Sequence, residues 1–308
     1  MELNKEKNFI SAVVYCHNEE KTIKSFIENL DNTLNANFLK YEIIIVNGAC
    51  TDNTIEIVKE YAKTKRGIVI SILNLSIAWG AEYGINSGID LSIGDYVLEF
   101  DSTKVDYDWS LVMDMYRKSQ EGNDFVCAVS DRKINLGKRL FYHTINTSAP
   151  LAYHIGPCSF RLLSRRGINR VRSLTKTVAS RKVSYARSGL PMADVHYVAD
   201  KNCEMPHDSE PKVITTLLLY TSLGSVWSIK LVKYILLLFL LCIVYAIGSA
   251  IIAGTVSTTA VLVTLITACF TGVYGLLAIV AIYLKAVIDF VFKKKDVIFV
   301  SIEKLTNQ

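Results

Sequence analysis

The residues best suited to chemistry follow the ends of predicted strands. Glu19, Asn47, Asp52 and Asp101 each come within a few residues of the end of an apolar, β-rich run. Hard divalent cations such as Mg²⁺ or Mn²⁺ prefer carboxylate oxygens, and Asp101 is placed to supply one. Glu99 lies two residues before Asp101, so it points to the same face of the strand and is a second candidate metal ligand. The sequence therefore predicts a cation site at the end of this strand.

Each of these residues also has a purely structural interpretation. Asp101 is followed by Ser102 and Thr103, a pattern that suits a turn or a helix cap. Glu19 suits a capping carboxylate in the first turn of a helix, and Asp52 fits a turn or cap better than a ligand site.

The elements that must position these side chains alternate along the chain. Apolar runs predict strands at 9–15, 41–46, 68–73, 96–100 and 125–129. Amphipathic periodicity predicts helices at 21–34, from 51 onward, at 79–91 and at 111–120. This alternation implies an α/β fold with a doubly wound, mostly parallel sheet. In such sheets the ligand binds at the carboxyl ends of the strands, where the polar residues gather.

Several motifs and compositions are excluded. The sequence has no GxGxxG after the first strand, no GxxxxGK[ST], no HExxH and no GxSxG. Its seven cysteines show no CxxC spacing, which favours reduced thiols over zinc or a disulfide framework. The net charge of +5 is modest, and the lysines gather beside an apolar block, so we expect no nucleic-acid partner.

That apolar block predicts a membrane anchor. No charged residue lies between Lys233 and Lys285, a gap of about 50 residues, and a spanning helix needs about 20. We predict transmembrane helices at 231–253 and 260–284 in a hairpin at 231–285, preceded by an interfacial amphipathic segment at 213–230. Lysines flank only the outer ends, so the positive-inside rule places the domain at 1–212 and a tail at 286–308 in the cytoplasm. A buried helical hairpin of a soluble protein is the less favoured alternative.

Three motifs resemble those of a known family. They are Val13–Glu20 (VVYCHNEE), Ile44–Thr54 (IIVNGACTDNT) and Gly94–Asp101 (GDYVLEFD). Weaker matches are Ser130–Lys133 (SDRK), the stretch 156–166, and Ser209–Lys212 (SEPK). Together they are similar to the GT-A, family 2 glycosyltransferases. Their order and the apolar block most resemble the polyprenyl-phosphate (dolichol-phosphate-like) sugar transferases with a C-terminal membrane hairpin.

This resemblance implies roles for individual residues. Glu19 and Asn47 would line the pocket of a nucleotide sugar, and Asp101 would lie near its diphosphate as the catalytic residue, directly or through a divalent cation. The family's usual Asp-Asp-Gly-Ser is Asn47-Gly48-Ala49-Cys50 here, and its Asp-x-Asp is Asp101-Ser102-Thr103. Two carboxylates are therefore missing, and Glu99 is the candidate substitute.

The acceptor side needs cations. A polyprenyl phosphate is nucleophilic at neutral pH without a strong general base. Arg132 and Arg161 fall at motif positions and are the favoured phosphate ligands, since arginine suits bidentate phosphate contacts. The alternative is that these arginines solvate the surface or bind anionic lipid headgroups.

The resemblance implies an inverting hexosyltransferase of the inner (cytoplasmic) membrane, multi-pass, with its catalytic domain and both termini cytoplasmic. It would transfer a hexose from a UDP- or GDP-sugar to a polyprenyl phosphate and supply surface-polysaccharide or other extracytoplasmic glycosylation, with a homo-oligomer as a further expectation. Two alternatives remain: a transferase acting on a lipid-linked saccharide, and a degenerate, non-catalytic membrane-tethered homologue.

Overall fold

The chain forms two compact units. The computed structural model of the protein describes residues 5–65, 67–149, 151–174, 180–203 and 299–306, and isolated positions between 234 and 287. The first unit comprises residues 1–146, 151–211 and 295–308, and the second comprises 147–150 and 212–294. The polypeptide therefore leaves the first unit and returns to it near residue 295.

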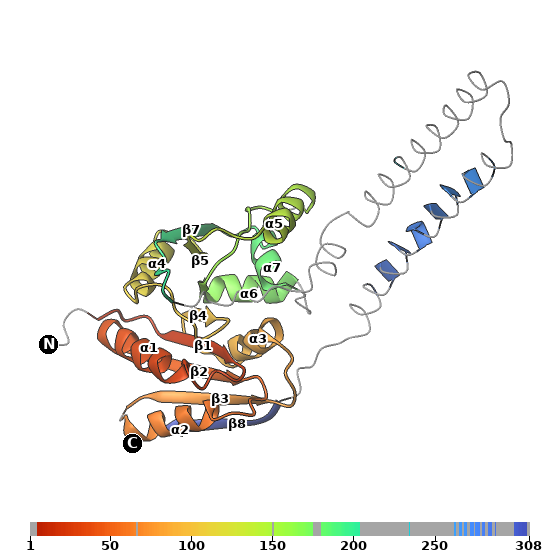
Figure 1. Ribbon diagram of the computed structural model, residues 1–308. Coiled ribbons are helices and arrows are strands. Elements are labelled where there is room, and N and C mark those ends of the chain that lie inside the picture. The colour runs from red at the N-terminus through yellow and green to blue at the C-terminus, as the bar shows by residue number, and fades with distance from the viewer. Residues whose placement is uncertain are drawn as a thin grey trace. The chain divides into compact units, whose positions relative to one another are not determined.

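A single mixed sheet organises the described part of the first unit (Figure 1). Its strand order is β7-β5-β6-β4-β1-β2-β3-β8. The central strands β4, β1, β2 and β3 are parallel, as is the β5–β7 pair, whereas β6 and β8 run antiparallel to their neighbours. The strands are β1 (Ile10–Cys16), β2 (Tyr41–Asn47), β3 (Val69–Leu75), β4 (Tyr96–Phe100), β5 (Phe125–Ser130), β6 (Phe160–Ser164), β7 (Met192–Tyr197) and β8 (Phe299–Thr306).

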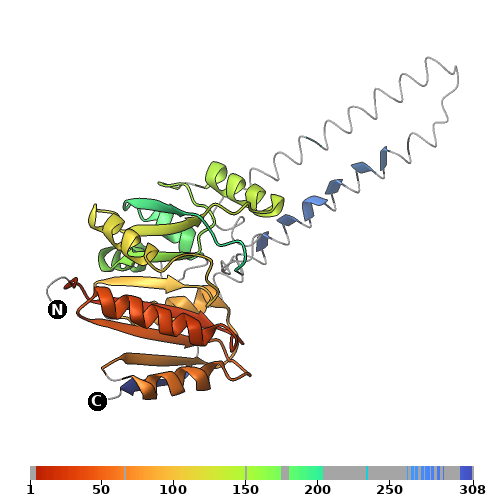
Figure 2. The same ribbon diagram turned by 60° about the vertical axis from the view of Figure 1, so that its left-hand side comes forward.

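Helices cover both faces of this sheet (Figures 1 and 2). Because side chains alternate along a strand, Ala12 and Val14 of β1 pack with α1, α2 and α4, while Val13 and Tyr15 pack with α3, α6 and α7. The helices are α1 (Ile23–Asn37), α2 (Thr54–Thr64), α3 (Ala81–Leu91), α4 (Leu111–Gln120), α5 (Leu136–Ser148), α6 (Arg165–Leu174) and α7 (Arg181–Arg187). The predicted α/β fold is confirmed. Four of the seven strand pairings in the described sheet are parallel and three are antiparallel, so the sheet is mixed with a parallel majority.

Two glycines let α3 approach the sheet closely. A Cβ built on Gly88 would lie 2.4 Å from Val13 Cγ1, and one on Gly84 would lie 2.7 Å from Tyr15 Cδ2. Any larger residue would push the helix away from β1. The close approach matters because the first turn of α3 carries Glu82, a buried carboxylate that faces the carboxyl end of β4.

The end of the chain completes the sheet. We expected residues 286–308 to form a separate tail, but residues 299–306 form β8, which pairs antiparallel with β3. The register joins Val69 to Thr306 and Ile72 to Glu303. The domain expected at 1–212 therefore includes a strand from the far end of the sequence.

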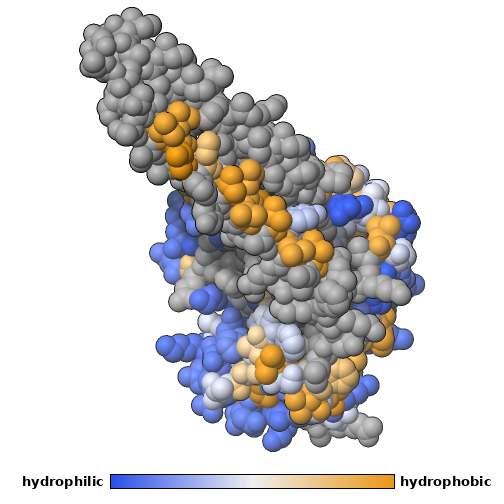
Figure 3. All heavy atoms as spheres, turned by 90° about the vertical axis from the view of Figure 1, so that its right-hand side faces the viewer, coloured by the Kyte–Doolittle hydropathy of each residue, from blue (hydrophilic) through white to orange (hydrophobic). Residues whose placement is uncertain are grey.

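The predicted spans at 231–253 and 260–284, like the interfacial segment at 213–230, lie outside the described residues except for isolated positions. Within the described residues, no helix has the length and hydropathy needed to cross a bilayer. Figure 3 shows large apolar side chains of the second unit in orange. The described large hydrophobic residues of this unit have exposed fractions between 45% and 68%; they are Tyr234, Leu262, Ile266, Val273, Leu277, Val280, Tyr283 and Leu284.

Candidate functional site

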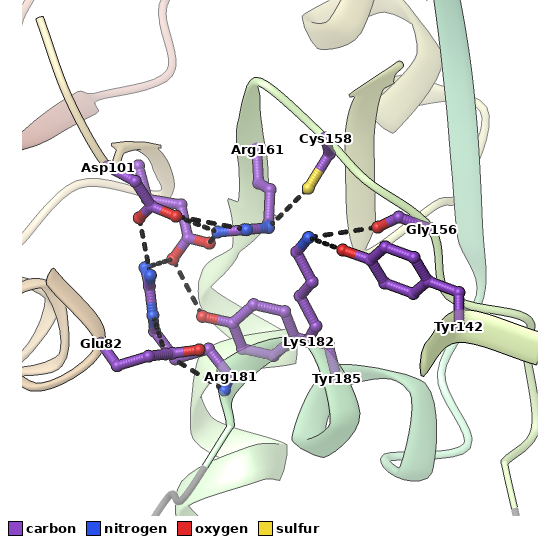
Figure 4. Close-up of polar contacts among 10 residues, drawn as sticks. Glu82, Asp101, Tyr142, Gly156, Cys158, Arg161, Arg181, Lys182 and Tyr185 are labelled. Carbon is purple, nitrogen blue, oxygen red and sulfur yellow. Dashed lines mark hydrogen bonds and ion pairs between the residues drawn. The ribbon is translucent and has the colours of Figure 1, made fainter. Parts of the chain in front are cut away.

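Five charged side chains, which we call the buried ion cluster, meet at the carboxyl end of β4 (Figure 4). Glu99 belongs to β4, and Asp101 is the first residue after that strand. Arg161 belongs to β6, Arg181 begins α7, and Glu82 lies in the first turn of α3. The antiparallel register places Glu99 opposite Arg161. Each of these side chains is 9% exposed or less. The cluster thus joins four elements at the edge where a ligand of such a sheet is expected.

Both β4 carboxylates face hydrogen-bond donors. Arg181 Nη2 donates to Asp101 Oδ1 at 2.6 Å, and Arg161 Nη2 donates to Asp101 Oδ2 at 3.4 Å. Arg161 Nη1 donates to Glu99 Oε1. The remaining oxygen of Glu99 accepts from Tyr185 Oη at 2.9 Å and lies 3.1 Å from Arg181 Nη1. All four oxygens of Glu99 and Asp101 therefore have positively charged or hydroxyl partners.

The third carboxylate holds Arg181 from the other side. Glu82 Oε2 accepts from Arg181 Nε at 2.6 Å and from the Arg181 backbone N–H at 3.3 Å. Burial raises the pKa of Glu82, and Asp101 adds to this effect. Burial opposes the charge of Arg181, but Asp101, Glu99 and Glu82 together raise the pKa of Arg181 well above its ordinary value. The guanidinium therefore stays charged in the interior because three carboxylates surround it.

This arrangement does not fit a divalent cation on Asp101 and Glu99, the predicted metal ligands. A cation would have to displace buried guanidinium groups, and an unpaired buried charge costs several kcal/mol, on the order of 3–5. Three carboxylates against two guanidinium groups leave at most one excess negative charge. In the described part of the chain, no group of three or more His, Cys, Asp or Glu side chains is arranged to hold a metal ion.

Glu19 lies beside the cluster and joins two loops. Its Oε2 accepts from the backbone N–H of Thr103 at 3.0 Å and from Thr103 Oγ1 at 2.7 Å. By the resemblance drawn from the sequence, Thr103 corresponds to the second aspartate of Asp-x-Asp. Glu19 therefore fixes the loop after β4 to the loop after β1, and Thr103 contributes a hydroxyl instead of a carboxylate.

Asn47 belongs to a different network at the end of β2, in which amide side chains take the place of the charged groups. Its Oδ1 accepts from the backbone N–H of Cys50 at 2.8 Å, and its Nδ2 donates to Asn74 Oδ1 at 2.8 Å. Asn74 Nδ2 in turn donates to Ser301 Oγ and to Glu303 Oε1, each at 2.9 Å. The residue expected to contact the nucleotide is thus connected to β8 through one neighbour.

Two of the sequence candidates have structural partners elsewhere. Arg132 Nε lies 2.9 Å from Asp106 Oδ2, and its Nη2 donates to the carbonyl oxygen of Cys203 at 2.8 Å. Arg132, in the loop after β5, therefore joins the loops that follow β4 and β7. Asp52 accepts from Thr54 Oγ1 at 2.6 Å and from the Thr54 backbone N–H at 3.0 Å, which confirms its interpretation as a turn or cap residue.

A small pocket, with a cavity volume of about 20 Å³, opens on the other side of Arg161. Residues of β5, β7 and the stretch 154–158 line it, together with Arg161, Lys182 and Tyr185. Lys182 Nζ donates to Tyr142 Oη at 2.9 Å and to the carbonyl oxygen of Gly156 at 3.1 Å (Figure 4). Two cationic side chains therefore border one cavity beside the buried ion cluster.

Sequence reasoning found Asp101, Glu99 and Arg161 but missed their partners. Arg181 and Lys182 lie in a stretch without a recognised motif. Glu82 has the sequence context of an ordinary acidic residue in the first turn of a helix. The one available signal was compositional: two adjacent cations begin α7, a short helix whose first six residues are buried. That burial is visible only in the folded chain.

The fold and site define a family. The model of the family described as Glycosyl transferase family 2 matches residues 11–185, more than half of the chain. The chain belongs to glycosyltransferase family 2.

Relatives agree with this assignment. The chain is 27% identical over 188 residues to an uncharacterized glycosyltransferase, sll0501, of Synechocystis sp., covering 58% of each chain. It is 33% identical over 99 residues to a dolichyl N-acetyl-alpha-D-glucosaminyl phosphate 3-beta-D-2,3-diacetamido-2,3-dideoxy-beta-D-glucuronosyltransferase of Methanococcus voltae, covering 30% of this chain and 28% of that one. The chain thus spans less than two thirds of the length of these relatives.

The fold also matches a solved structure. The mannosyltransferase PcManGT from Pyrobaculum calidifontis, in complex with GDP-Man and Mn²⁺, aligns with a TM-score of 0.50 and 16% sequence identity. The alignment covers 94% of this chain and 89% of that chain. At this identity the match shows a shared fold, and that structure holds its nucleotide sugar together with a cation.

Proposed function

We propose that this protein transfers a hexose from a nucleotide-diphosphate sugar to a polyprenyl phosphate at the cytoplasmic leaflet of the inner membrane. The product would supply surface-polysaccharide or other extracytoplasmic glycosylation. Family membership supports a sugar-nucleotide donor. The structural match that holds GDP-Man supports the donor class. The relative whose name includes a dolichyl-phosphate-linked sugar supports an acceptor on a polyprenyl lipid, and it fits the lipid-linked saccharide alternative as well.

The observation that carries the acceptor assignment is the pairing of the central carboxylates. A sugar hydroxyl acceptor needs a general base, and a carboxylate bound to guanidinium groups is a weak base. Asp101 and Glu99 accept from Arg161 and Arg181 in this way. A phosphate monoester is already ionised at neutral pH and attacks without such help. The site therefore favours a phosphate over the hydroxyl of a lipid-linked saccharide.

The chemistry that follows is a single displacement. An acceptor phosphate oxygen attacks the anomeric carbon, the bond to the donor diphosphate breaks, and the nucleoside diphosphate leaves with inversion. Glu19 and Asn47 stand on the donor side, at the ends of β1 and β2. Arg161 and Lys182 border the pocket beyond β4 and supply positive charge for the acceptor phosphate.

Three features support attachment to the membrane through 231–285. No charged residue lies between Lys233 and Lys285. The described apolar side chains of that unit are about half exposed, which is unfavourable in water and suits lipid. Finally, β8 belongs to the same sheet as β1–β4, so the chain must return to the side that it left. Two transmembrane helices would return the chain to that side, whereas a single one would not.

The test is transfer by the purified full chain in detergent. UDP- and GDP-sugars are offered with a short polyprenyl phosphate or, in two parallel arms, with the matching polyprenol and with a polyprenyl-linked saccharide. We expect transfer to the phosphate alone. Transfer to the polyprenol or to a lipid-linked saccharide at a comparable rate would overturn the acceptor assignment, because it requires a base.

Asp101→Asn keeps the shape of the side chain and removes its charge, and we expect it to abolish transfer. The matched control is Asp90→Asn, which removes an exposed carboxylate paired with Arg172 and should leave the rate unchanged. Nucleotide binding without transfer under any condition would instead support the non-catalytic, membrane-tethered alternative, which the paired carboxylates also favour.

A further inference from the structure

A directional chain of hydrogen bonds runs from β2 to β8. The backbone N–H of Cys50 donates to Asn47, Asn47 donates to Asn74, and Asn74 donates to Glu303. The three donor–acceptor distances are 2.8, 2.8 and 2.9 Å. The chain connects residues that are 229 positions apart at its last step.

Its two ends determine its direction. A backbone N–H only donates, so Asn47 must turn its oxygen toward Cys50. An ionised carboxylate only accepts, so Asn74 must turn its nitrogen toward Glu303 and its oxygen toward Asn47. Lys59 Nζ lies 3.0 Å from the other oxygen of Glu303, and its hydrogen bond is the main cause that lowers the pKa of Glu303. Glu303 is therefore ionised at neutral pH.

The orientation of the Asn47 amide decides what it offers a ligand. An amide nitrogen carries two hydrogens, and one of the two on Asn47 is used by Asn74. Among the described residues no hydrogen bond uses the second. With Asn74 fixed by Glu303, Asn47 presents this N–H as a donor. The matching group on a nucleobase is a carbonyl oxygen, which uracil and guanine carry and adenine lacks.

We propose that Glu303 is a positioning residue for the nucleotide pocket: acting through Asn74, and together with the Cys50 backbone N–H, it holds the Asn47 amide so that a base with a carbonyl oxygen is preferred. This inference rests on the proposed function, because it takes Asn47 as the residue that meets the base. It gives β8 a role in donor selection. A strand from the far end of the sequence thus helps to determine that Asn47, at the end of β2, presents its amide N–H to a ligand.

Nucleotide affinity of the purified full chain in detergent provides the test, measured by calorimetry with UDP, GDP and ADP. Glu303→Gln keeps the size of the side chain but allows either end of its amide to face Asn74. We expect the dissociation constant for the preferred nucleotide to rise about fivefold to tenfold, the effect of one hydrogen bond between neutral groups. Affinity for ADP should change less than twofold, so the preference for a carbonyl-bearing base falls.

Two variants serve as matched controls. Lys59→Met removes the ion pair with Glu303 and leaves the hydrogen bond to Asn74. Lys304→Gln changes the neighbouring residue of β8, whose side chain is exposed. Both should bind all three nucleotides within twofold of the unaltered chain. Asn47→Ala combined with Glu303→Gln should bind no more weakly than Asn47→Ala alone.

The outcomes separate the two ideas. If the unaltered chain prefers UDP or GDP and Glu303→Gln leaves that preference unchanged, the positioning role is overturned and the proposed function stands. An equal loss for all three nucleotides, together with a lower melting temperature, would show a structural role only and also overturn it. If the unaltered chain binds none of the three, the proposed function fails and the inference fails with it.

Discussion

The two networks at the carboxyl edge of the sheet solve opposite electrostatic problems. The buried ion cluster places three carboxylates and two guanidinium groups together and pairs them with one another, with Arg181 bound by Glu82, Glu99 and Asp101. The chain from Cys50 to Glu303 uses neutral amides and places its only charge at the far end, on a partly exposed carboxylate. Because its charges are buried, the first network is essential to the stability of the fold. The second network instead determines which atom of the Asn47 amide faces a ligand.

Removal of one charge from the buried ion cluster should have the largest effect. Arg181→Met leaves three buried carboxylates with one guanidinium, and we expect the free energy of unfolding to fall by about 3–5 kcal/mol. Arg172→Met is the matched control, because its partner Asp90 is 69% exposed and surface pairs contribute about 0–1 kcal/mol. Urea unfolding of both variants measures the difference. Equal losses would contradict a special role for burial.

A second change should partly reverse the first. Adding Glu82→Gln to Arg181→Met removes a carboxylate that the first substitution left without its guanidinium. We expect the double variant to recover about 1–2 kcal/mol, because contacting residues couple by roughly 0.5–3 kcal/mol. The same urea titration, completed with Glu82→Gln alone, gives the coupling energy. Strict additivity of the two single changes would show that these groups do not interact.

Chelation should have a small effect on donor binding. Because Asp101 and Glu99 are bound to arginines, we expect UDP and GDP to bind with dissociation constants that differ less than about threefold between EDTA and Mn²⁺, under 1 kcal/mol. Calorimetry on the purified chain measures both conditions. A loss of tenfold or more in EDTA that Mn²⁺ restores, and that Asp101→Asn abolishes, would show that a cation displaces the arginines.

The smallest effect concerns pH at the other network. The pKa of Glu303 is lowered on folding, so its contribution to stability is present above its unfolded pKa and is lost as the pH falls through the folded value. The melting temperatures of Glu303→Gln and the unaltered chain should therefore differ by a constant amount between pH 6 and 8 and converge below about pH 4.5. A difference that grows on acidification would contradict this sign.

Local patterns predicted the frame of the site well. The strand at 96–100 and the helix at 111–120 were predicted at their observed bounds, since each is a short apolar or amphipathic run with clear ends. The position of Asp101 at the end of β4 followed from the same reasoning. Such features depend on neighbouring residues, which the sequence displays directly.

Long-range pairing was beyond the same reasoning. β8 has an alternating pattern that suits a strand, but its partner β3 lies more than 220 residues earlier, and nothing local indicates that partner. Asp101 and Glu99 were predicted to meet a cation, and the partner that the chain supplies is a guanidinium from the start of α7. The sequence around a carboxylate at a strand end does not show whether its partner is a metal cation or a guanidinium group.

The pairing of β3 with β8 has a consequence for synthesis on the ribosome. β3 ends at Leu75, whereas its neighbour ends at Thr306. At about 5–20 residues per second, the ribosome needs on the order of ten to fifty seconds to add the residues between them. Throughout that time the nascent sheet has an open edge of unpaired N–H and C=O groups, a template for aggregation. The domain is therefore expected to depend on chaperones, or on early contact with the membrane, until translation delivers its last strand.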